Sequence, residues 1–219
     1  MHTTVAHIAT EAGSYVLSDL GVVALLKQML AFLLTNGLAG RSLMVFVDGQ
    51  RNHLHTALVK ALGCWRSWQV ILDWYQLEKR CRENLNLALK GRLIRKQVLE
   101  HLLALLWDGR VGSALEYLAG LASEQIKNAA ELAKLIGYLQ RQRPHIPCYS
   151  VRKQLVRLAQ FKQSRREREC PMVATRQKHN GMSWSPPGSI AVAALATAAR
   201  NQEADRWFRT GQIEFKLAA

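Results

Sequence analysis

Apolar and polar residues along the first 80 positions alternate in short runs. Residues 3–8 and 14–18 have β character and flank a short turn, which predicts an antiparallel hairpin. Residues 21–35 are apolar on nearly every side of a helix, so we expect a buried helix packed on the sheet. The alternation continues with a strand at 43–47, a helix at 51–62 and a strand at 68–72. These elements predict one mixed α/β sheet in which the last two strands are parallel neighbours.

A long helical stretch follows. Residues 74–142 contain no proline and show only helical periodicity, which predicts three or four helices that break near Gly91, Gly109–Gly112 and Gly120. Ser123, with Glu124 and Gln125 in a first turn, predicts the start of the last helix. The expected organisation is a partial α/β core at 1–80, a helical insertion at 81–147, and a basic strap plus a helical part at 148–219 that completes the core.

Charge narrows the possible partners. Thirty Lys and Arg against sixteen Asp and Glu give the 219-residue chain a net charge of +14, which favours nucleic acid or an anionic membrane. No apolar run approaches the ~18–20 residues that a membrane span requires, and the N-terminus lacks the features of a signal peptide. We therefore expect a cytoplasmic, nucleoid-associated chain with no membrane partner. Four widely spaced cysteines form no CxxC pair, so buried free thiols are expected.

Two acids stand where a predicted strand gives way to a helix. Asp48 follows the strand at 43–47, and Asp73 follows the strand at 68–72. Open α/β sheets place their chemistry at the C-terminal ends of strands, so two such acids in a basic chain suggest a metal-dependent enzyme acting on a polyanion. The alternative is that each Asp only caps the helix after it.

The most basic segment is 151–178, with nine Lys or Arg against two Glu. Such a run is usually a solvated helix face or a strap. The neighbouring turn at 185–189 favours a phosphate-contacting role, and an alanine-rich helix is predicted at 189–201. The residues expected to form the DNA-binding face and its anchor are Arg152, Lys153, Arg157, Arg176, Lys178 and Trp184.

Several strings carry a resemblance to a known family. These strings are FVDGQ, VILDWYQLEKRC, KLIGYLQRQRPHIPCYSVRKQL, RQKHNGMSWSPPGSIAVAAL and WFRTGQIEFKLAA. Together they resemble the C-terminal half of a bacterial insertion-sequence transposase of the DDE type. The resemblance extends over nearly the whole chain. It implies an incomplete RNase H-like mixed sheet with a large all-helical insertion, and metal-dependent DNA cleavage and strand transfer as the activity.

The resemblance also implies a metal site. Two Mg²⁺ or Mn²⁺ ions roughly 3.5–4 Å apart would clamp the attacking and leaving oxygens of a phosphodiester. Asp48 matches the family's second acid, and Glu167 is the acid nearest to the third, so these two are the candidate catalytic residues and metal ligands. Asp73 and Glu169 are candidate supporting residues. The His that commonly follows Asp-Trp-Tyr in the family is replaced here by Gln76.

The sequence departs from the family pattern in two places. The family's first acid lies on a strand ahead of the hairpin, and this sequence begins at the hairpin, so that acid is expected to be missing. The family string that supplies the final Glu, RNSSNxxEKxND, is replaced by AQFKQSRREREC at 159–170. A one-base shift of the reading frame through these codons permits Asn-Ser-Ser-Asn, Glu-Lys and Asn at the family's spacing. We interpret 158–170 as a frame-shifted segment in which Glu167 neighbours the lost Glu; the alternative is a diverged loop in which Glu167 or Glu169 still binds metal.

Three functions stay open on the sequence alone. The first is an inactive transposase fragment, and the second is a non-enzymatic DNA-binding remnant. The third is an active metal-dependent nuclease with Asp19 as its first acid. The expected partner is DNA, either the ends of the insertion sequence or non-specific duplex, and assembly of several copies on DNA is left open.

Overall fold

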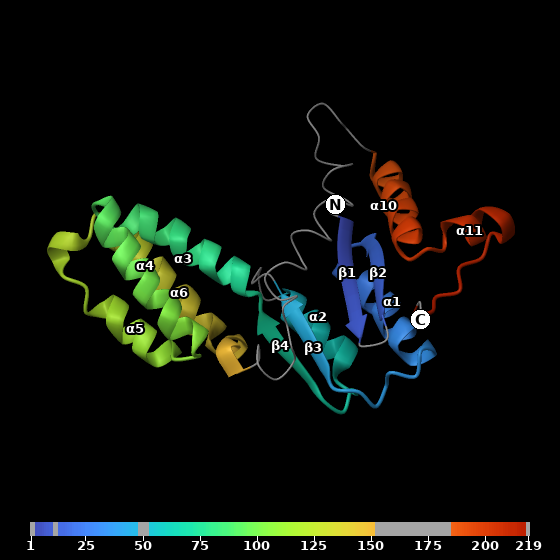
Figure 1. Cartoon of the computed structure of the whole chain (residues 1–219), viewed down its shortest axis with the longest axis horizontal. Coiled ribbons are helices and arrows are strands. Elements are labelled where there is room, and N and C mark those ends of the chain that lie inside the picture. Colours follow the sequence, from blue (N-terminus) through green and yellow to red (C-terminus); the bar gives the residue numbers. More distant parts are fainter. Residues whose placement is uncertain (1–2, 11–12, 48–52, 152–184, 218–219) are drawn as a thin grey trace. The chain divides into compact units, whose positions relative to one another are not determined.

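The described part of the chain is α/β and divides into two units. The structure, a computed structural model, describes residues 3–10, 13–47, 53–151 and 185–217. The first unit contains β1 (Thr3–Thr10), β2 (Gly13–Leu20), α1 (Val22–Thr35), α2 (His53–Leu62), α10 (Pro186–Arg200) and α11 (Ala204–Thr210) (Figure 1). The second contains β3 (Leu43–Val47) and β4 (Trp68–Leu72), apart from the first residue of each, with α3 (Trp74–Ala88), α4 (Arg92–Trp107), α5 (Val111–Ala119) and α6 (Ala129–Gln142).

The first unit is built on a hairpin. β1 and β2 pair antiparallel from Thr3 opposite Leu20 to Thr10 opposite Gly13, which confirms the prediction. Both α1 and α10 pack against β2, and three consecutive β2 residues, Tyr15 to Leu17, are buried. Neighbouring strand residues point to opposite sides of a sheet, so burial of three in a row means that both sides of β2 are covered.

Polar side chains from the C-terminal segment bind the edge of this hairpin. The carboxamide of Asn201 accepts a hydrogen bond from the N–H of Val16 at 2.9 Å and donates one to the carbonyl of Val16 at 2.9 Å. The buried carboxylate of Glu203 accepts hydrogen bonds from the Tyr15 hydroxyl at 2.6 Å and from the N–H of Phe215 at 3.0 Å. A buried carboxylate is costly unless it is hydrogen-bonded, and these donors meet that requirement.

The last described residues pack on α1. Asn36, at the end of α1, donates to the carbonyl of Phe215 at 3.0 Å and accepts from the N–H of Leu217 at 3.0 Å. The Phe215 ring lies edge-on to Tyr15 and Phe32, with ring centroids 5.8 and 5.2 Å away. Asn201, Glu203 and Phe215 therefore attach the C-terminal segment to the first unit, although α11 between them has no buried residue.

The strands β3 and β4 are parallel neighbours, as predicted. At their N-terminal ends the N–H of Leu43 donates to the carbonyl of Ser67 at 2.9 Å, and at their C-terminal ends the N–H of Asp73 donates to the carbonyl of Val47 at 2.8 Å. The described strands form two separate two-stranded sheets, so the prediction of one shared sheet is wrong for these residues. An apolar run shows that a strand forms, but its partner is decided by contacts distant in sequence.

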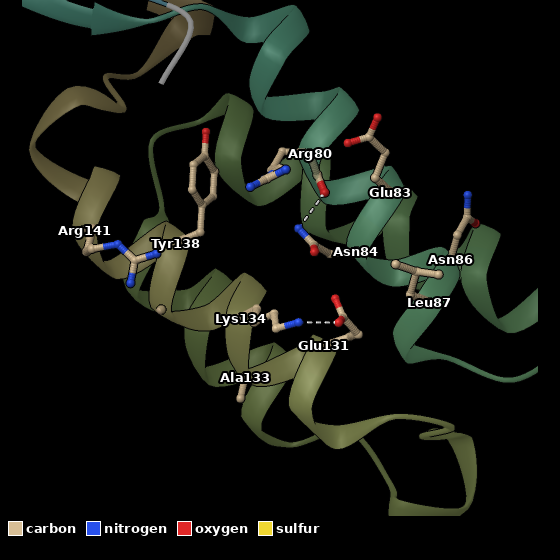
Figure 2. Close-up of a pocket in the computed structure, with 11 residues that line it drawn as sticks. Arg80, Glu83, Asn84, Asn86, Leu87, Glu131, Ala133, Lys134, Tyr138 and Arg141 are labelled. Atoms are coloured by element: carbon tan, nitrogen blue, oxygen red, sulfur yellow. Dashed lines mark hydrogen bonds and ion pairs between the residues drawn. The ribbon is translucent and has the colours of Figure 1, made fainter. Parts of the chain in front are cut away.

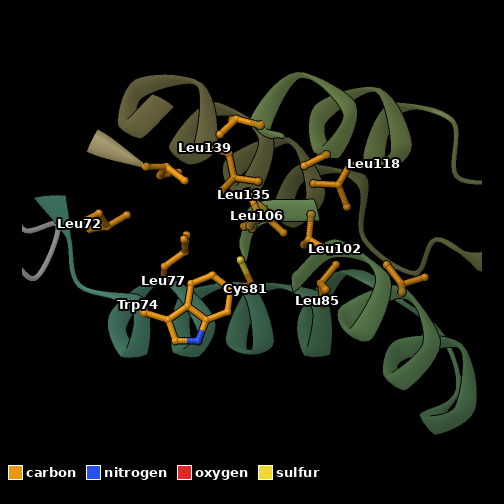
Figure 3. Packing of buried hydrophobic residues seen from close by; sticks show 14 of the residues in the cluster. Leu72, Trp74, Leu77, Cys81, Leu85, Leu102, Leu106, Leu118, Leu135 and Leu139 are labelled. Atoms are coloured by element: carbon orange, nitrogen blue, oxygen red, sulfur yellow. The ribbon is translucent and has the colours of Figure 1, made fainter. Parts of the chain in front are cut away.

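The helices of the second unit enclose their own core. Side chains at helical spacing on α3 meet leucines of α4, α5 and α6 (Figure 3), and α3 and α6 lie side by side (Figure 2). At most 1% of each central side chain is exposed: Leu77, Cys81, Leu85, Leu102, Leu106, Leu118, Leu135 and Leu139. This confirms the predicted helical block.

The turn between α4 and α5 depends on Gly109. Its φ is +72°, and a Cβ there would lie 2.9 Å from the backbone N of Cys148. Only glycine avoids both the left-handed strain and this collision, so the predicted break near Gly109 has a structural cause.

Two helix starts differ from the predictions. Ser123–Gln125 form only a short 3-10 helix, and α6 begins at Ala129, where the Asn128 side chain accepts from the N–H groups of Ala130 and Glu131. The cause is tertiary, because the N–H groups of Lys127 and Asn128 both donate to the carbonyl of Ala88. At the other site α10 starts at Pro186 rather than 189, with Ser185 as its cap, because proline is favoured in the first helical turn.

The three described cysteines, Cys64, Cys81 and Cys148, are free thiols, and Cys170 lies outside the described residues. Cys81 is buried as predicted, whereas Cys64 is exposed and Cys148 is half-buried, so the prediction of burial is wrong for these two. Burial, with a smaller contribution from Glu78, raises the pKa of Cys81 to about 12, so this thiol is unreactive. No helix in the described ranges is both long and apolar enough to span a membrane.

We expect Tyr15→Phe to lower the free energy of unfolding by about 1–3 kcal/mol, because buried Glu203 loses a donor while the ring stays in place. Chemical denaturation followed by circular dichroism measures the change. Tyr117→Phe is the control and should change stability little, because the Tyr117 hydroxyl forms no hydrogen bond among the described residues and the ring keeps its contact with His101. Equal losses in the two variants would show that the Tyr15–Glu203 bond does not stabilise the fold.

The same pair predicts a pH dependence. Burial, with the hydrogen bond to Glu203, raises the pKa of Tyr15 above its usual value. The hydroxyl therefore stays protonated in the folded state at a pH where the unfolded chain ionises. Its contribution to stability is complete below about pH 10 and decreases as the pH rises further. Tyr15→Phe should reduce this alkaline loss.

Candidate functional site

The C-terminal ends of β3 and β4 meet at one edge of their sheet. The N–H of Asp73, the residue after β4, donates to the carbonyl of Val47 at 2.8 Å. Val47 is the last residue of β3 and directly precedes Asp48 in the sequence. The two strand ends that precede the predicted acids are therefore adjacent, which is where open α/β sheets carry their sites.

Asp73 begins helix α3. Its Oδ1 atom accepts a hydrogen bond from the N–H of Gln76 at 3.1 Å, and the residue is 5% exposed. This confirms Asp73 as a helix-start residue. The N-terminus of a helix carries partial positive charge, so the carboxylate is favoured there. Gln76 contributes its backbone N–H to this cap.

Three aromatic residues fix the chain on either side of Asp73. The Tyr149 hydroxyl donates to the carbonyl of Leu72 at 2.7 Å. The Trp74 ring lies edge-on to Trp107 and Tyr149, with centroids 4.7 and 5.1 Å away, and Trp107 stacks on Tyr149 at 5.8 Å. The residues before and after Asp73 are thus both held, which positions its carboxylate.

The sequence did not identify this aromatic cluster as part of the site. Trp74, Trp107 and Tyr149 are 33 or more positions apart in sequence, and nothing in their spacing predicts that they meet.

Asp19 is engaged locally in the first unit. Its Oδ1 accepts from the N–H of Leu20 at 2.6 Å, and its Oδ2 accepts from the side-chain amide of Gln28 at 2.7 Å. The bond to Gln28 joins β2 to α1 and the bond to Leu20 lies within β2, which is a structural role for the one early acid that the nuclease hypothesis uses.

The other candidates lie outside the described residues. These include the acids Asp48, Glu167 and Glu169 and the DNA-binding candidates Arg152, Lys153, Arg157, Arg176, Lys178 and Trp184. The convergence of the acids and the position of the basic segment stay predictions.

The described part of the chain offers few ligands for a metal ion. Within residues 3–10, 13–47, 53–151 and 185–217, no group of three or more His, Cys, Asp or Glu could hold a metal ion. At the strand edge the described chain supplies one carboxylate, Asp73, and Mg²⁺ needs several oxygen ligands. The described donors alone do not fit a Mg²⁺ ion.

Comparisons of the chain with family models, with curated proteins and with solved structures gave no match. The resemblance to transposases therefore rests on the sequence strings quoted above.

Asp73→Ala should lower the free energy of unfolding by about 0.5–2 kcal/mol, because α3 loses its cap. Asp73→Asn should keep most of the parent's stability, because Asn is also a good cap. Thermal or urea unfolding measures both. The control is Asp108→Ala at the C-terminal end of α4, where the exposed acid lies at the unfavourable end of the helix dipole. A decrease for Asp108→Ala as large as that for Asp73→Ala would contradict the capping role.

Proposed function

We propose that this chain is a DNA-binding protein derived from an insertion-sequence transposase with an RNase H-like core, in which DNA cleavage has been lost. The observation that carries the proposal is the parallel β3–β4 pair, in which Asp73 binds the residue immediately before Asp48. This is the arrangement that an acid-bearing sheet edge requires. The element order, a hairpin followed by helix, strand, helix and strand, supports the same origin.

Charge supports DNA as the partner. A net charge of +14 favours a polyanion, and nine of the thirty cationic residues are concentrated in 151–178. Lys and Arg that neutralise phosphates release condensed counterions, which gives affinity that does not depend on sequence. The residues we propose for this contact are Arg152, Lys153, Arg157, Arg176 and Lys178, with Trp184 as an anchor.

We propose the loss of cleavage because the carboxylates that two-metal chemistry needs are incomplete. Two-metal chemistry needs several carboxylates directed at the same ions, because stabilisation of the transition-state charge is usually the largest catalytic effect. The string at 159–170 departs from the family at the final Glu, and both oxygens of Asp19 are hydrogen-bonded within the first unit. A bound Mg²⁺ pair would supply nucleophile activation and leaving-group stabilisation, with Asp48 and Glu167 as its nearest candidate ligands.

DNA binding should weaken steeply with salt. In fluorescence anisotropy with a labelled duplex, we expect the triple variant R152Q/K153Q/R157Q to reduce the slope of log affinity against log salt by about 0.9 for each phosphate that the variant no longer neutralises. The control variant R82Q/R92Q/K96Q removes three exposed cations of α3 and α4 and should leave the slope unchanged. A parent affinity that is the same at low and high salt would contradict the proposal.

Cleavage should be absent. Incubation with supercoiled plasmid carrying the DNA that flanks the gene, in Mg²⁺ or Mn²⁺, should yield neither nicked nor joined products on a gel. Metal-dependent cleavage that Asp48→Ala abolishes and Asp108→Ala preserves would instead establish the active-nuclease alternative.

A further inference from the structure

A groove of about 770 Å³ lies between α3 and α6 on the second unit (Figure 2). Arg80 and Asn84 of α3 form one wall, and Tyr138 and Arg141 of α6 form the other. The residues on each helix are three or four positions apart, so their side chains emerge on one face. The groove belongs entirely to the second unit, whose core is separately packed.

The charges in the groove leave a positive excess. Its two carboxylates are each paired with a lysine: Glu131 with Lys134 at 2.5 Å and Glu83 with Lys79 at 3.8 Å. Within the described part of the chain, neither Arg80 nor Arg141 forms an ion pair with a carboxylate. Two guanidinium groups therefore supply the net charge of this surface.

Tyr138 sets the position of one guanidinium. The Cζ atom of Arg80 lies 5.8 Å from the centroid of the Tyr138 ring. Such a contact uses the face of the guanidinium and leaves N–H groups at its edge for an anion. Arg141 follows Tyr138 by three positions on the same side of α6, so cations flank the ring from both helices (Figure 2).

Gly137 makes room for the second guanidinium. A Cβ at this position would lie 3.2 Å from Nη1 of Arg141, closer than ordinary contact. Glycine in the middle of a helix is less favourable than alanine. Its presence in the middle of α6 lets the Arg141 side chain lie against the helix backbone inside the groove.

We propose that the groove between α3 and α6 binds the phosphate backbone of a nucleic acid strand, with Arg80 and Arg141 each holding a phosphate. Planar guanidinium groups match phosphate oxygens in bidentate geometry. The inference rests on the proposed function, which names DNA as the partner, and adds a contact surface that is separate in sequence from 151–178. Nucleic acid is favoured over an acidic peptide because the whole chain has the charge of a polyanion-binding protein.

The test uses the full chain and labelled duplex DNA. R80Q/R141Q should lower the slope of log affinity against log salt by about 1 for each arginine. The control R92Q/K96Q removes two exposed cations from α4 and should leave the slope at the parent value. Unfolding curves of both variants establish that each is folded.

The outcomes separate the two proposals. Equal slopes for R80Q/R141Q, the control and the parent, with strong parent binding, would overturn the groove and leave the proposed function standing. No DNA binding by the parent would overturn both. If R80Q/R141Q loses binding to labelled poly-glutamate but keeps the parent's DNA slope, the occupant is an acidic peptide and the inference is wrong.

Discussion

The first unit depends on closure of a two-stranded hairpin by residues almost two hundred positions away. A hairpin alone is marginal in water, because it cannot bury enough apolar surface on its own. Here Tyr15 is covered by Phe32 and Phe215, and its hydroxyl is bound by Glu203. Burial of the Glu203 carboxylate is offset by hydrogen bonds from the Tyr15 hydroxyl and the Phe215 N–H. The hairpin, α1 and the C-terminal segment must therefore form together, which makes this unit a product of long-range contacts.

The second unit has the opposite character. Its helices follow one another directly, and their leucines meet across short connections, so most of its core forms from neighbours in sequence. One distant contact matters most, the bond from Tyr149 to the carbonyl of Leu72. It ties the end of the helical block to the end of β4 and fixes the backbone at Asp73. The helical block thus holds the strand edge at which the candidate acid lies.

The sequence predicted where strands and helices form well, but it predicted poorly which of them pair or pack together. The bounds of β3 and β4 match the prediction at both ends, because each is a short apolar run with polar flanks. The same alternation could not reveal that the described strands separate into two sheets. Ser123 has the chemistry of a helix cap, yet the Ala88 carbonyl binds the N–H groups of Lys127 and Asn128 and delays the helix. At the site, Asp73 could be predicted as a helix start from its position after a strand. The Trp74–Trp107–Tyr149 cluster could not, because nothing in the spacing of three distant aromatic residues fixes their contact.

Binding and cleavage differ in how much sequence change they tolerate, and this difference underlies the proposed function. Affinity for a polyanion is a sum over many cations, so removal of any one phosphate-binding cation changes the salt slope by about one unit only. Two-metal cleavage depends on every carboxylate ligand, because the loss of one leaves the charge of the transition state unbalanced. A transposase sequence altered at 159–170 would therefore lose cleavage while most of its cations persist. Glu83 and Glu131 are balanced by their own lysines, so Arg80 and Arg141 keep their positive charge whatever happens at the strand edge. A chain of this kind can remain a DNA-binding protein after its chemistry is gone.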